Sequence, residues 1–363
     1  MQSQKKTARN CAAAAAAGLL LSAAPVFAAP SAAAPGFSVS SGTPLLAQRA
    51  STGTVVAQGG NFSLPLPDGR TLWLLNNIWA GELKTGAPAE VWGIVDGGAA
   101  LAPSTAPYAQ AGALAYVADE NGWPLPLLSG DLGEYSQVRK FWPRAGLLAD
   151  GKYYVFYSIM NNFGQGPYDY FRVGQGLAVS GAPAGPYAKV RMGTRYSLWN
   201  DVEPAFGSAA LSDEDGWIYV YGRVMTGPGE YAAQLARVRP SGLTSRDKYA
   251  YYAADSSSGS WTPDIAEAAD VLAGLPEEFS VSHNARLNGY LAVYSGPDGS
   301  ALARLAPAPW GPWGEPFTLL ACRAEEYCYG AKEQAGFSGE GGKQIFLTIE
   351  KKNAPYLYEI KFK

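Results

Sequence analysis

The sequence predicts an all-β protein, and more specifically a five-bladed β-propeller. Three observations support this prediction: the composition, a hairpin signature that occurs five times, and a third strand-like run after each hairpin. Charged residues make up only 16% of the chain and aromatic residues 12%, and there are 43 Gly and 26 Pro. This mixture favours short strands separated by tight turns over a helix bundle.

The hairpin signature is an Asp-Gly, Asn-Gly or Gly-Gly pair followed by a run of β-branched and aromatic residues. Such pairs favour the backbone twist of a two-stranded hairpin. The five copies are DGRTLWLL from Asp68, DGKYYVFYS from Asp150, DGWIYVYGR from Asp215, NGYLAVYSG from Asn288 and GGKQIFLTI from Gly341. A strand-like run precedes each pair, as NFSLPL does in the first copy.

A third run follows each hairpin: EVWGIV, GLAVSGAP, QLARVRP, ALARLAP and YLYEIKF. Repeated units of three or more strands are typical of a β-propeller, so five units predict five blades in one domain over residues 55–363. In the preceding segment, residues 29–54, the stretch around Phe37 to Leu46 would add a fourth strand to the last blade. This strand would close the ring and remove exposed sheet edges. A β-sandwich of meandering hairpins is the alternative fold.

Residues 1–28 have the organisation of a secretory signal peptide. The basic residues Lys5, Lys6 and Arg9 precede the apolar stretch CAAAAAAGLLLSAAP, and VFA before Ala29 is a cleavage motif. The apolar stretch is shorter than the ~20 residues that a membrane span needs. We therefore predict a secreted or periplasmic protein without a membrane span, from which this segment is removed.

The two cysteines beyond the signal peptide, Cys322 and Cys328, lie in ACRAEEYCYG. In an oxidising compartment we expect this pair to form a disulfide. A metal site is the alternative, although partner ligands are missing nearby. Loss of three basic residues with the signal peptide changes the formal charge from -3 to -6. A mildly acidic protein is a poor nucleic-acid binder, so we expect no nucleic-acid partner.

The first strand of each propeller blade lines the central channel, so residues upstream of each turn are candidates for a functional site. From the first blade to the fifth they are Gly60 and Asn61; Trp142 and Arg144; Asp201 and Glu203; Glu278, His283 and Asn284; and Lys332 and Glu333. Cleavage of a glycosidic bond requires converging carboxylates, since one acid protonates the leaving oxygen and another attacks the sugar or activates water. We therefore predict Asp201, Glu203 and Glu278 as catalytic residues. The others except Gly60 would bind substrate, with Trp199 as a stacking face for a sugar ring.

Each of these candidates also has a structural alternative. Asp201 could bind nearby backbone in a turn, and Glu333 could pair with a neighbouring cation. His283 is the single histidine, so it cannot join a multi-histidine metal site and could be a packed strand residue. No cofactor is expected. A Ca²⁺ ion in the central channel is conceivable with Asp201 and Glu203 nearby, although no ligand spacing demonstrates it.

Several phrases resemble a bacterial family of domains of unknown function, family 4185. They are GNFSLPLPDGRTLWLL, LWNDVEPAFGSAAL with DGWIYVYGR, EEFSVSHNARLNGYLAVYSG, APAPWGPWGEPFTL and CYGAKEQAGFSGEGGKQIFLTI. The likeness runs from about Val55 to Phe362. The resemblance implies a five-bladed propeller, and some members of the family form glycoside hydrolase family 183, endo-acting D-arabinanases.

In those enzymes the expected catalytic acids lie in the first blade, and the resemblance maps them to Gly60 and Asn77 here. Neither residue can transfer a proton, because an amide does not titrate and glycine has no side chain. Glu203, Glu278 and Lys332 match acidic or basic positions that the resemblance leads us to expect. Asn77 is then a substrate-binding candidate rather than a catalytic one.

Three functions fit this pattern. The protein is a hydrolase of another specificity that uses Glu203 and Glu278, a non-catalytic glycan-binding propeller, or a structural or cell-surface interaction protein. We expect a monomeric, carbohydrate-directed protein whose partner is a polysaccharide or another glycan, such as arabinan or another furanoside polymer. Whether it is an endo-acting enzyme stays open at this point.

Overall fold

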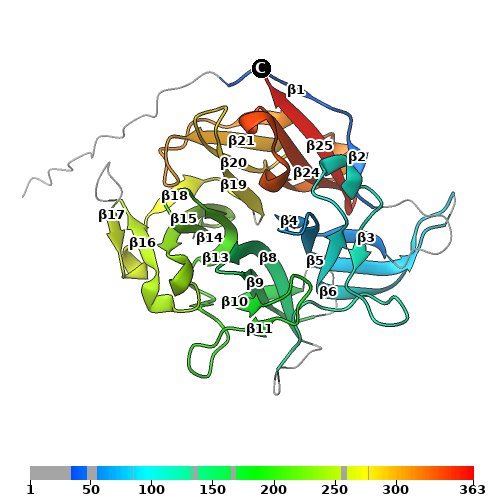
Figure 1. The fold of residues 1–363 in the computed structure, drawn as a ribbon, viewed down its shortest axis with the longest axis horizontal. Helices are drawn as coiled ribbons and strands as arrows, with labels where there is room; N and C mark the ends of the chain where they lie inside the picture. The colour runs from blue at the N-terminus through cyan, green and yellow to red at the C-terminus, as the bar shows by residue number, and fades with distance from the viewer. Residues whose placement is uncertain are drawn as a thin grey trace, which may run out of the picture.

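The computed structural model describes residues 34–46, 55–84, 86–131, 134, 138–164, 169–254, 260–276 and 278–363. The strands form five sheets, in each of which neighbouring strands are antiparallel, and the sheets surround a central axis (Figure 1). The prediction of an all-β, five-bladed propeller is therefore confirmed.

The first sheet contains β3 (Val55–Gly59), β4 (Phe62–Pro65), β5 (Thr71–Glu82), β6 (Glu90–Ala102) and β7 (Ala115–Tyr116). Both β3 and β4 pair with β5, so together they make one interrupted inner strand. The interruption falls at Gly60 and Asn61, whose φ angles are 91° and 51°. This left-handed conformation is easily adopted by glycine and tolerated by asparagine.

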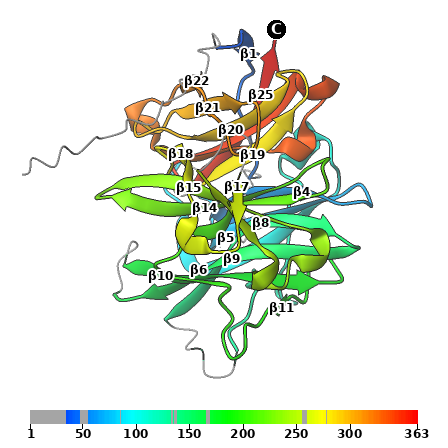
Figure 2. The same ribbon diagram turned by 90° about the vertical axis from the view of Figure 1, so that its left-hand side faces the viewer.

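The second, third and fourth sheets follow in chain order. The second contains β8 (Arg139–Ala149), β9 (Lys152–Asn162), β10 (Tyr170–Ser180), β11 (Ala188–Lys189) and β12 (Trp199–Asn200). The third contains β13 (Ala205–Ser212), β14 (Ile218–Gly227), β15 (Glu230–Val238), β16 (Ala250–Ala253), β17 (Ser260–Thr262) and β18 (Asp270–Ala273). The fourth contains β19 (Phe279–Asn284), β20 (Gly289–Ser295), β21 (Ala301–Ala306) and β22 (Phe317–Leu320). Figure 2 shows the third sheet between its two neighbours.

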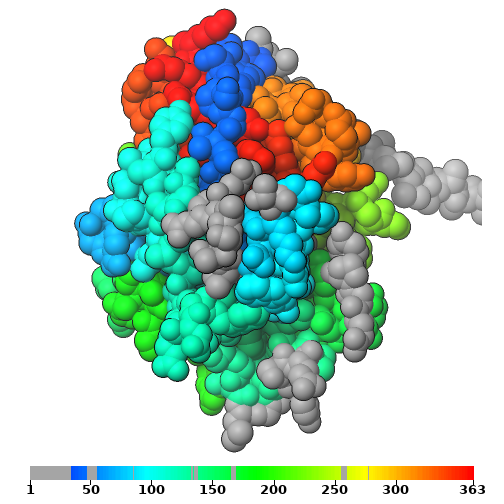
Figure 3. All heavy atoms as spheres, turned by 90° about the vertical axis from the view of Figure 1, so that its right-hand side faces the viewer, coloured from blue at the N-terminus to red at the C-terminus, as the bar shows by residue number. Residues whose placement is uncertain are grey.

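The fifth sheet is built from both ends of the chain. It contains β23 (Cys328–Glu333), β24 (Gln344–Lys351) and β25 (Ala354–Phe362), with β1 (Phe37–Val39) as its outermost strand and β2 (Thr43–Pro44) on the same edge. In the register of this pairing Phe37 lies opposite Phe362. Figure 3 shows the early segment, in blue, against the last strands, in red. The ring is thus closed by strand pairing between segments that are far apart in sequence.

Helical structure in the described ranges is limited to short 3-10 helices. They are η1 (Pro107–Gln110), η2 (Pro240–Gly242), η3 (Arg246–Lys248), η4 (Ile265–Glu267), η5 (Ala324–Glu326), η6 (Ala335–Phe337) and η7 (Glu340–Gly342). None of the helices that the structure describes is long and apolar enough to cross a bilayer. The predicted turn at Gly341 belongs to η7, in a longer connection than the two-residue turn expected from its Gly-Gly pair.

Apolar clusters fill the space between neighbouring sheets. One cluster joins the second and third sheets and contains Phe156, Trp199 and Phe206. Trp199 is fully buried, and its indole nitrogen donates to the hydroxyl of Tyr251 over 3.2 Å. The expectation that Trp199 offers a stacking face to a sugar is therefore wrong, because core side chains cover it.

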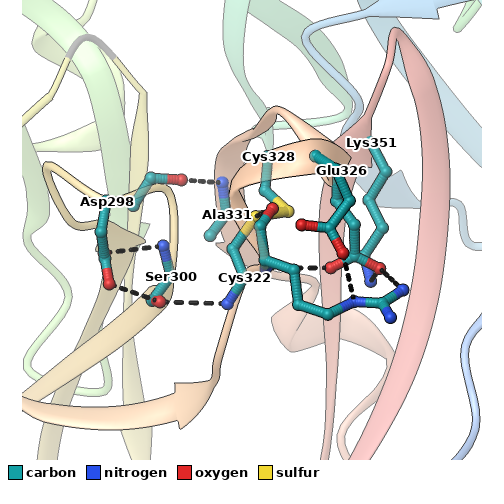
Figure 4. Close-up of a disulfide and its surroundings, with 10 residues drawn as sticks. Asp298, Ser300, Cys322, Glu326, Cys328, Ala331 and Lys351 are labelled. Atoms are coloured by element: carbon teal, nitrogen blue, oxygen red, sulfur yellow. Dashed lines mark hydrogen bonds and ion pairs between the residues drawn. A yellow bond between two sulfur atoms is a disulfide. The ribbon is translucent and has the colours of Figure 1, made fainter.

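The predicted disulfide is confirmed by the bond between Cys322 and Cys328 (Figure 4). The Glu326 carboxylate lies close to both sulfur atoms and is ion-paired with Lys351 over 3.2 Å. Because the two sulfurs are bonded to each other, they are not the thiolates that a metal ion would need.

Closure of the ring can be tested at Leu45, which follows β2 and is fully buried against the first and fifth sheets. Leu45→Ala should lower the free energy of unfolding by about 2–5 kcal/mol, because it leaves a cavity at the junction. Val39→Ala is the control, since Val39 lies on β1 and is 38% exposed. Urea unfolding measures both variants, and equal, small losses would contradict the role of this junction.

Candidate functional site

Side chains from four blades meet at the axis of the ring. Glu278 directly precedes β19 and accepts hydrogen bonds from Asn76 on β5 over 2.5 Å and from Arg144 on β8 over 3.3 Å. The ammonium of Lys332, on β23, donates to the other carboxylate oxygen of Glu278. The side chains of Arg144 and Lys332 are only 4% and 1% exposed, whereas that of Glu278 is 12% exposed. Two buried cations thus converge on one partly accessible carboxylate.

A second carboxylate lies beside this group. Glu350, on β24, is 1% exposed, and its Oε1 accepts hydrogen bonds from the N–H of Gly60 over 3.0 Å and from the amide of Asn61 over 2.8 Å. A Cβ added at Gly330 would lie 3.3 Å from Oε2 of Glu278 and 3.4 Å from Oε1 of Glu350. The two carboxylates therefore approach one small space that this glycine keeps open.

The surroundings of Glu350 change its proton affinity. Burial raises the pKa of Glu350 to about 7, and the nearby negative charge of Glu278 acts in the same direction, while Lys332 opposes it. One site therefore holds an ion-paired carboxylate next to a carboxyl group that keeps its proton up to near-neutral pH. Carboxyl groups in unlike protonation states are what acid–base catalysis requires.

The first blade supplies hydrogen-bond donors to this site where the resemblance placed acids. Gly60 and Asn61 donate to Glu350, and Asn76 donates to Glu278. Asn77 lies outside the cluster, where its amide nitrogen, turned toward Asp96, donates over 3.1 Å. The amide and backbone groups of this blade therefore hold carboxylates that come from other blades.

Trp142 connects the cluster to Asp96 on the neighbouring blade. The guanidinium carbon of Arg144 lies 5.8 Å from the centre of its ring, and its Nε1 donates to Asp96 over 3.4 Å. Asp96 also pairs with Lys140 over 2.8 Å. Since Trp142 is only 5% exposed, it supports the site and offers little surface to a ligand.

Two of the predicted catalytic acids lie elsewhere. Both oxygens of Glu203 contact the guanidinium of Arg246, and Oε2 also accepts the N–H of Asn200 over 2.8 Å. Asp201 is exposed, and its carbonyl oxygen accepts a hydrogen bond from Arg172. The structure does not bring either acid to Glu278. Nor do they fit a calcium site, because a guanidinium occupies the oxygens of Glu203.

Glu333 is close in sequence to Lys332 but lies on the other side of β23. Its carboxylate accepts hydrogen bonds from Ser282 and, over 3.0 Å, from Ser338, between the fourth and fifth sheets. Burial raises the pKa of Glu333 to about 7. This carboxyl group is thus part of the packing between blades, in line with a structural role and not with a cation pair.

His283 and Asn284 lie at the opposite end of the channel from Glu278. They end β19, roughly 20 Å along the strand from its beginning. His283 is exposed beside the ring of Tyr290, at 5.1 Å between centres. Asn284 is buried and donates to the carbonyl of Gly342 over 2.9 Å. The contacts of both residues are therefore separate from the cluster around Glu278.

Sequence reasoning predicted Arg144, Glu278 and Lys332 but missed Asn76 and Glu350. Both missed residues lie on second strands, from which the prediction had taken only Asn77. The signal that could have found them is the hairpin itself, because the second strand returns to the end of the axis where the first began. A polar residue at the end of such an apolar run, as in FLTIEKK, marks that end.

Comparisons with known proteins agree with this architecture. The family model for a domain of unknown function, DUF4185, matches residues 118–358. The sequence matches no curated protein. A Bacteroides ovatus ATCC 8483 protein, provisionally named a hydrolase, has a similar structure, with a TM-score of 0.60 and 18% identity over 85% of this chain and 86% of that one.

Two glycoside hydrolases have a similar fold at a TM-score of 0.50. One is Zg3597, a family 117 enzyme from Zobellia galactanivorans, at 12% identity over 90% of each chain. The other is the GH43_1 enzyme of Xanthomonas citri, at 15% identity over 88% of this chain and 90% of that one. At these identities the likeness shows a shared fold and nothing about activity.

Glu333 should make stability depend on pH. Its folded pKa of about 7 exceeds its ordinary value of 4.5, so the folded state binds the proton more tightly. The contribution of Glu333 to the free energy of unfolding is therefore complete below pH 4.5 and is lost as the pH rises through 7. Glu333→Gln should match the native protein near pH 4.5 and exceed it at pH 8.5 by roughly 2–4 kcal/mol in unfolding free energy.

Urea unfolding at the two pH values measures this difference. Glu325→Gln is the matched control, because that side chain is 68% exposed and its charge costs no desolvation. An advantage of Glu333→Gln that stays constant from pH 4.5 to 8.5 would contradict the shifted pKa.

Proposed function

Since the chain belongs to the DUF4185 family, we propose that it is a carbohydrate-directed propeller of the glycoside hydrolase type, with its site at the axial cluster. The observation that carries this proposal is the pair of Glu278 and Glu350. Glu278 is partly exposed and held by Arg144 and Lys332, while Glu350 keeps a proton near neutral pH. Hydrolysis of a glycoside needs one carboxylate that attacks the anomeric carbon or activates a water molecule, and one acid that protonates the leaving oxygen.

In this proposal the carboxylate of Glu278 either attacks the anomeric carbon or activates the water that does so, and the protonated carboxyl of Glu350 protonates the leaving oxygen. The fold shared with two glycoside hydrolases supports the reaction class by analogy alone. Arabinan and other furanoside polysaccharides are the first substrates to test, because the family resemblance points to them. We propose that the protein acts as a monomer.

A propeller that binds glycans without cleaving them is the second candidate function. The observation in its favour is the confinement of Glu350, which is 1% exposed and held by Gly60 and Asn61. A carboxyl group this enclosed reaches a leaving oxygen only if the site opens. The two candidates agree on the location of the ligand and differ in whether a bond is broken.

Polysaccharide hydrolysis should depend on Glu278. We expect the native protein to release reducing ends from at least one member of a panel of arabinan, arabinogalactan and xylan. Glu278→Gln and Glu350→Gln should each lower the rate by about 10²-fold or more, while binding of the polymer is retained. Reducing-end assays and affinity electrophoresis measure the two properties.

The matched control is Glu203→Gln, which removes an ion-paired carboxylate outside the cluster and should leave the rate unchanged once folding is verified. Binding without release of reducing ends by the native protein would favour the second candidate. If the native protein shows no binding and no release of reducing ends with any polymer of the panel, a carbohydrate-directed function is contradicted.

We also propose that the protein is secreted or periplasmic. The disulfide between Cys322 and Cys328 supports this, because such bonds persist in oxidising compartments. The protein recovered from the periplasm or the medium should begin at Ala29, as measured by N-terminal sequencing and intact mass. Accumulation in the cytoplasm with residues 1–28 still attached would contradict the proposal.

A further inference from the structure

The hairpin that joins β5 to β6 carries exposed apolar side chains at the same end of the axis as Glu278. Val91, Trp92 and Ile94 are 50%, 54% and 53% exposed. β5 continues for six residues beyond Asn76, which contacts Glu278, so the hairpin extends away from the cluster on this side before it turns back. Neighbouring apolar side chains left in water together commonly mark a binding surface.

This apolar strip is defined here as Trp92 and Ile94. Ile94 connects it with the candidate site through Asp96, while Trp92 is the next exposed side chain outward and lies where the pairing with β5 shifts register. Side chains alternate along a strand, so Ile94 and Asp96 project from the same face of β6. The pairing with β5 is regular between Gly93 and Asp96, which keeps the alternation intact there. Asp96 in turn contacts Trp142, the side chain that lies against Arg144 in the cluster.

The next blade exposes apolar rings on its corresponding hairpin. Phe163, which follows β9, and Phe171, on β10, are 68% and 48% exposed, and their ring centres lie 6.2 Å apart. Beside them in sequence, Tyr170 packs on Trp142 at 4.6 Å. Apolar surface therefore occurs on both sides of the contact between Trp142 and Asp96.

We propose that Trp92 and Ile94 form an outer subsite for a sugar chain whose inner end occupies the axial cluster, so that the ligand is a polymer and not a small glycoside. This inference rests on the proposed carbohydrate function and specifies its ligand. From Asp96 to Trp92 the strand covers roughly 13 Å, so a ligand that reaches both has more than one sugar unit. The indole of Trp92 offers a flat apolar face, which suits the apolar face of a sugar ring, while its N–H interacts with the carboxylate of Glu90.

A membrane or a protein partner fits the strip less well. Membrane-binding surfaces surround apolar side chains with excess basic residues. Here Glu82 and Glu90 outnumber Lys84 around the hairpin tip, and Lys84 is already paired with Glu90. A stable protein interface buries about 800 Å² on each partner, which is much more than two side chains on one hairpin provide.

The test compares a polymer with a short oligosaccharide of the same sugar, both chosen from the panel by binding to the native protein. Trp92→Ala and Ile94→Ala should each weaken polymer binding about tenfold, which corresponds to about 1.4 kcal/mol, and leave binding of the disaccharide unchanged. Tyr108→Ala is the matched control, because Tyr108 is an aromatic residue that is 51% exposed on η1, beyond the far end of β6. It should change neither affinity.

The outcomes separate this inference from the function on which it rests. If Glu278→Gln impairs hydrolysis while Trp92→Ala binds polymer as tightly as the native protein, the outer subsite is overturned and the proposed function stands. If the native protein binds no carbohydrate, the proposed function fails, and the subsite with it. Two further outcomes would overturn the inference, both with polymer binding intact in Trp92→Ala. Loss of self-association would assign the strip to a second copy of the protein, and loss of binding to anionic vesicles would assign it to a lipid surface.

Discussion

The ion pairing of Glu278 with Arg144 and Lys332 is the interaction on which the candidate site depends. Each cation is almost fully buried, and an isolated charge in that environment would be strongly unfavourable. The carboxylate that pairs with both cations comes from a different blade than either of them. The same contact therefore fixes the second, fourth and fifth blades around the axis.

The amides of the first blade are explained by this arrangement. The sequence suggested that a pair of acids had been lost, with Gly60 and Asn77 in their places. In the structure, the neighbouring Asn61 and Asn76 donate to two carboxylates from other blades, and Gly60 adds a backbone donor. A carboxylate at position 61 could not donate the hydrogen bond that Oε1 of Glu350 accepts from the amide of Asn61. Amides and buried acids are thus complementary parts of one hydrogen-bond network.

The fold could be predicted from the sequence because its turns and alternating strands are local patterns. The site could be predicted only in part, since a strand fixes where a residue lies but not which partner its side chain finds. Glu278 and Lys332 were predicted correctly to lie at the axis. Glu203 also precedes an inner strand, yet it turns to Arg246, a residue more than 40 positions later that no local pattern connects to it. Glu350 was missed because its importance arises from contacts with the first blade, almost 300 residues away in sequence.

The pairing of β1 with β25 has a consequence for how the protein acquires its site. The fifth blade combines one of the earliest described strands with the last, so it cannot be completed until the whole chain has been synthesised. Contacts of such long sequence separation form late, because they close the largest loops. Lys332 and Glu350 both lie in this blade. Assembly of the buried charges therefore coincides with closure of the ring, and a chain that lacks its end is left with Arg144 and Glu278 in an unfinished site.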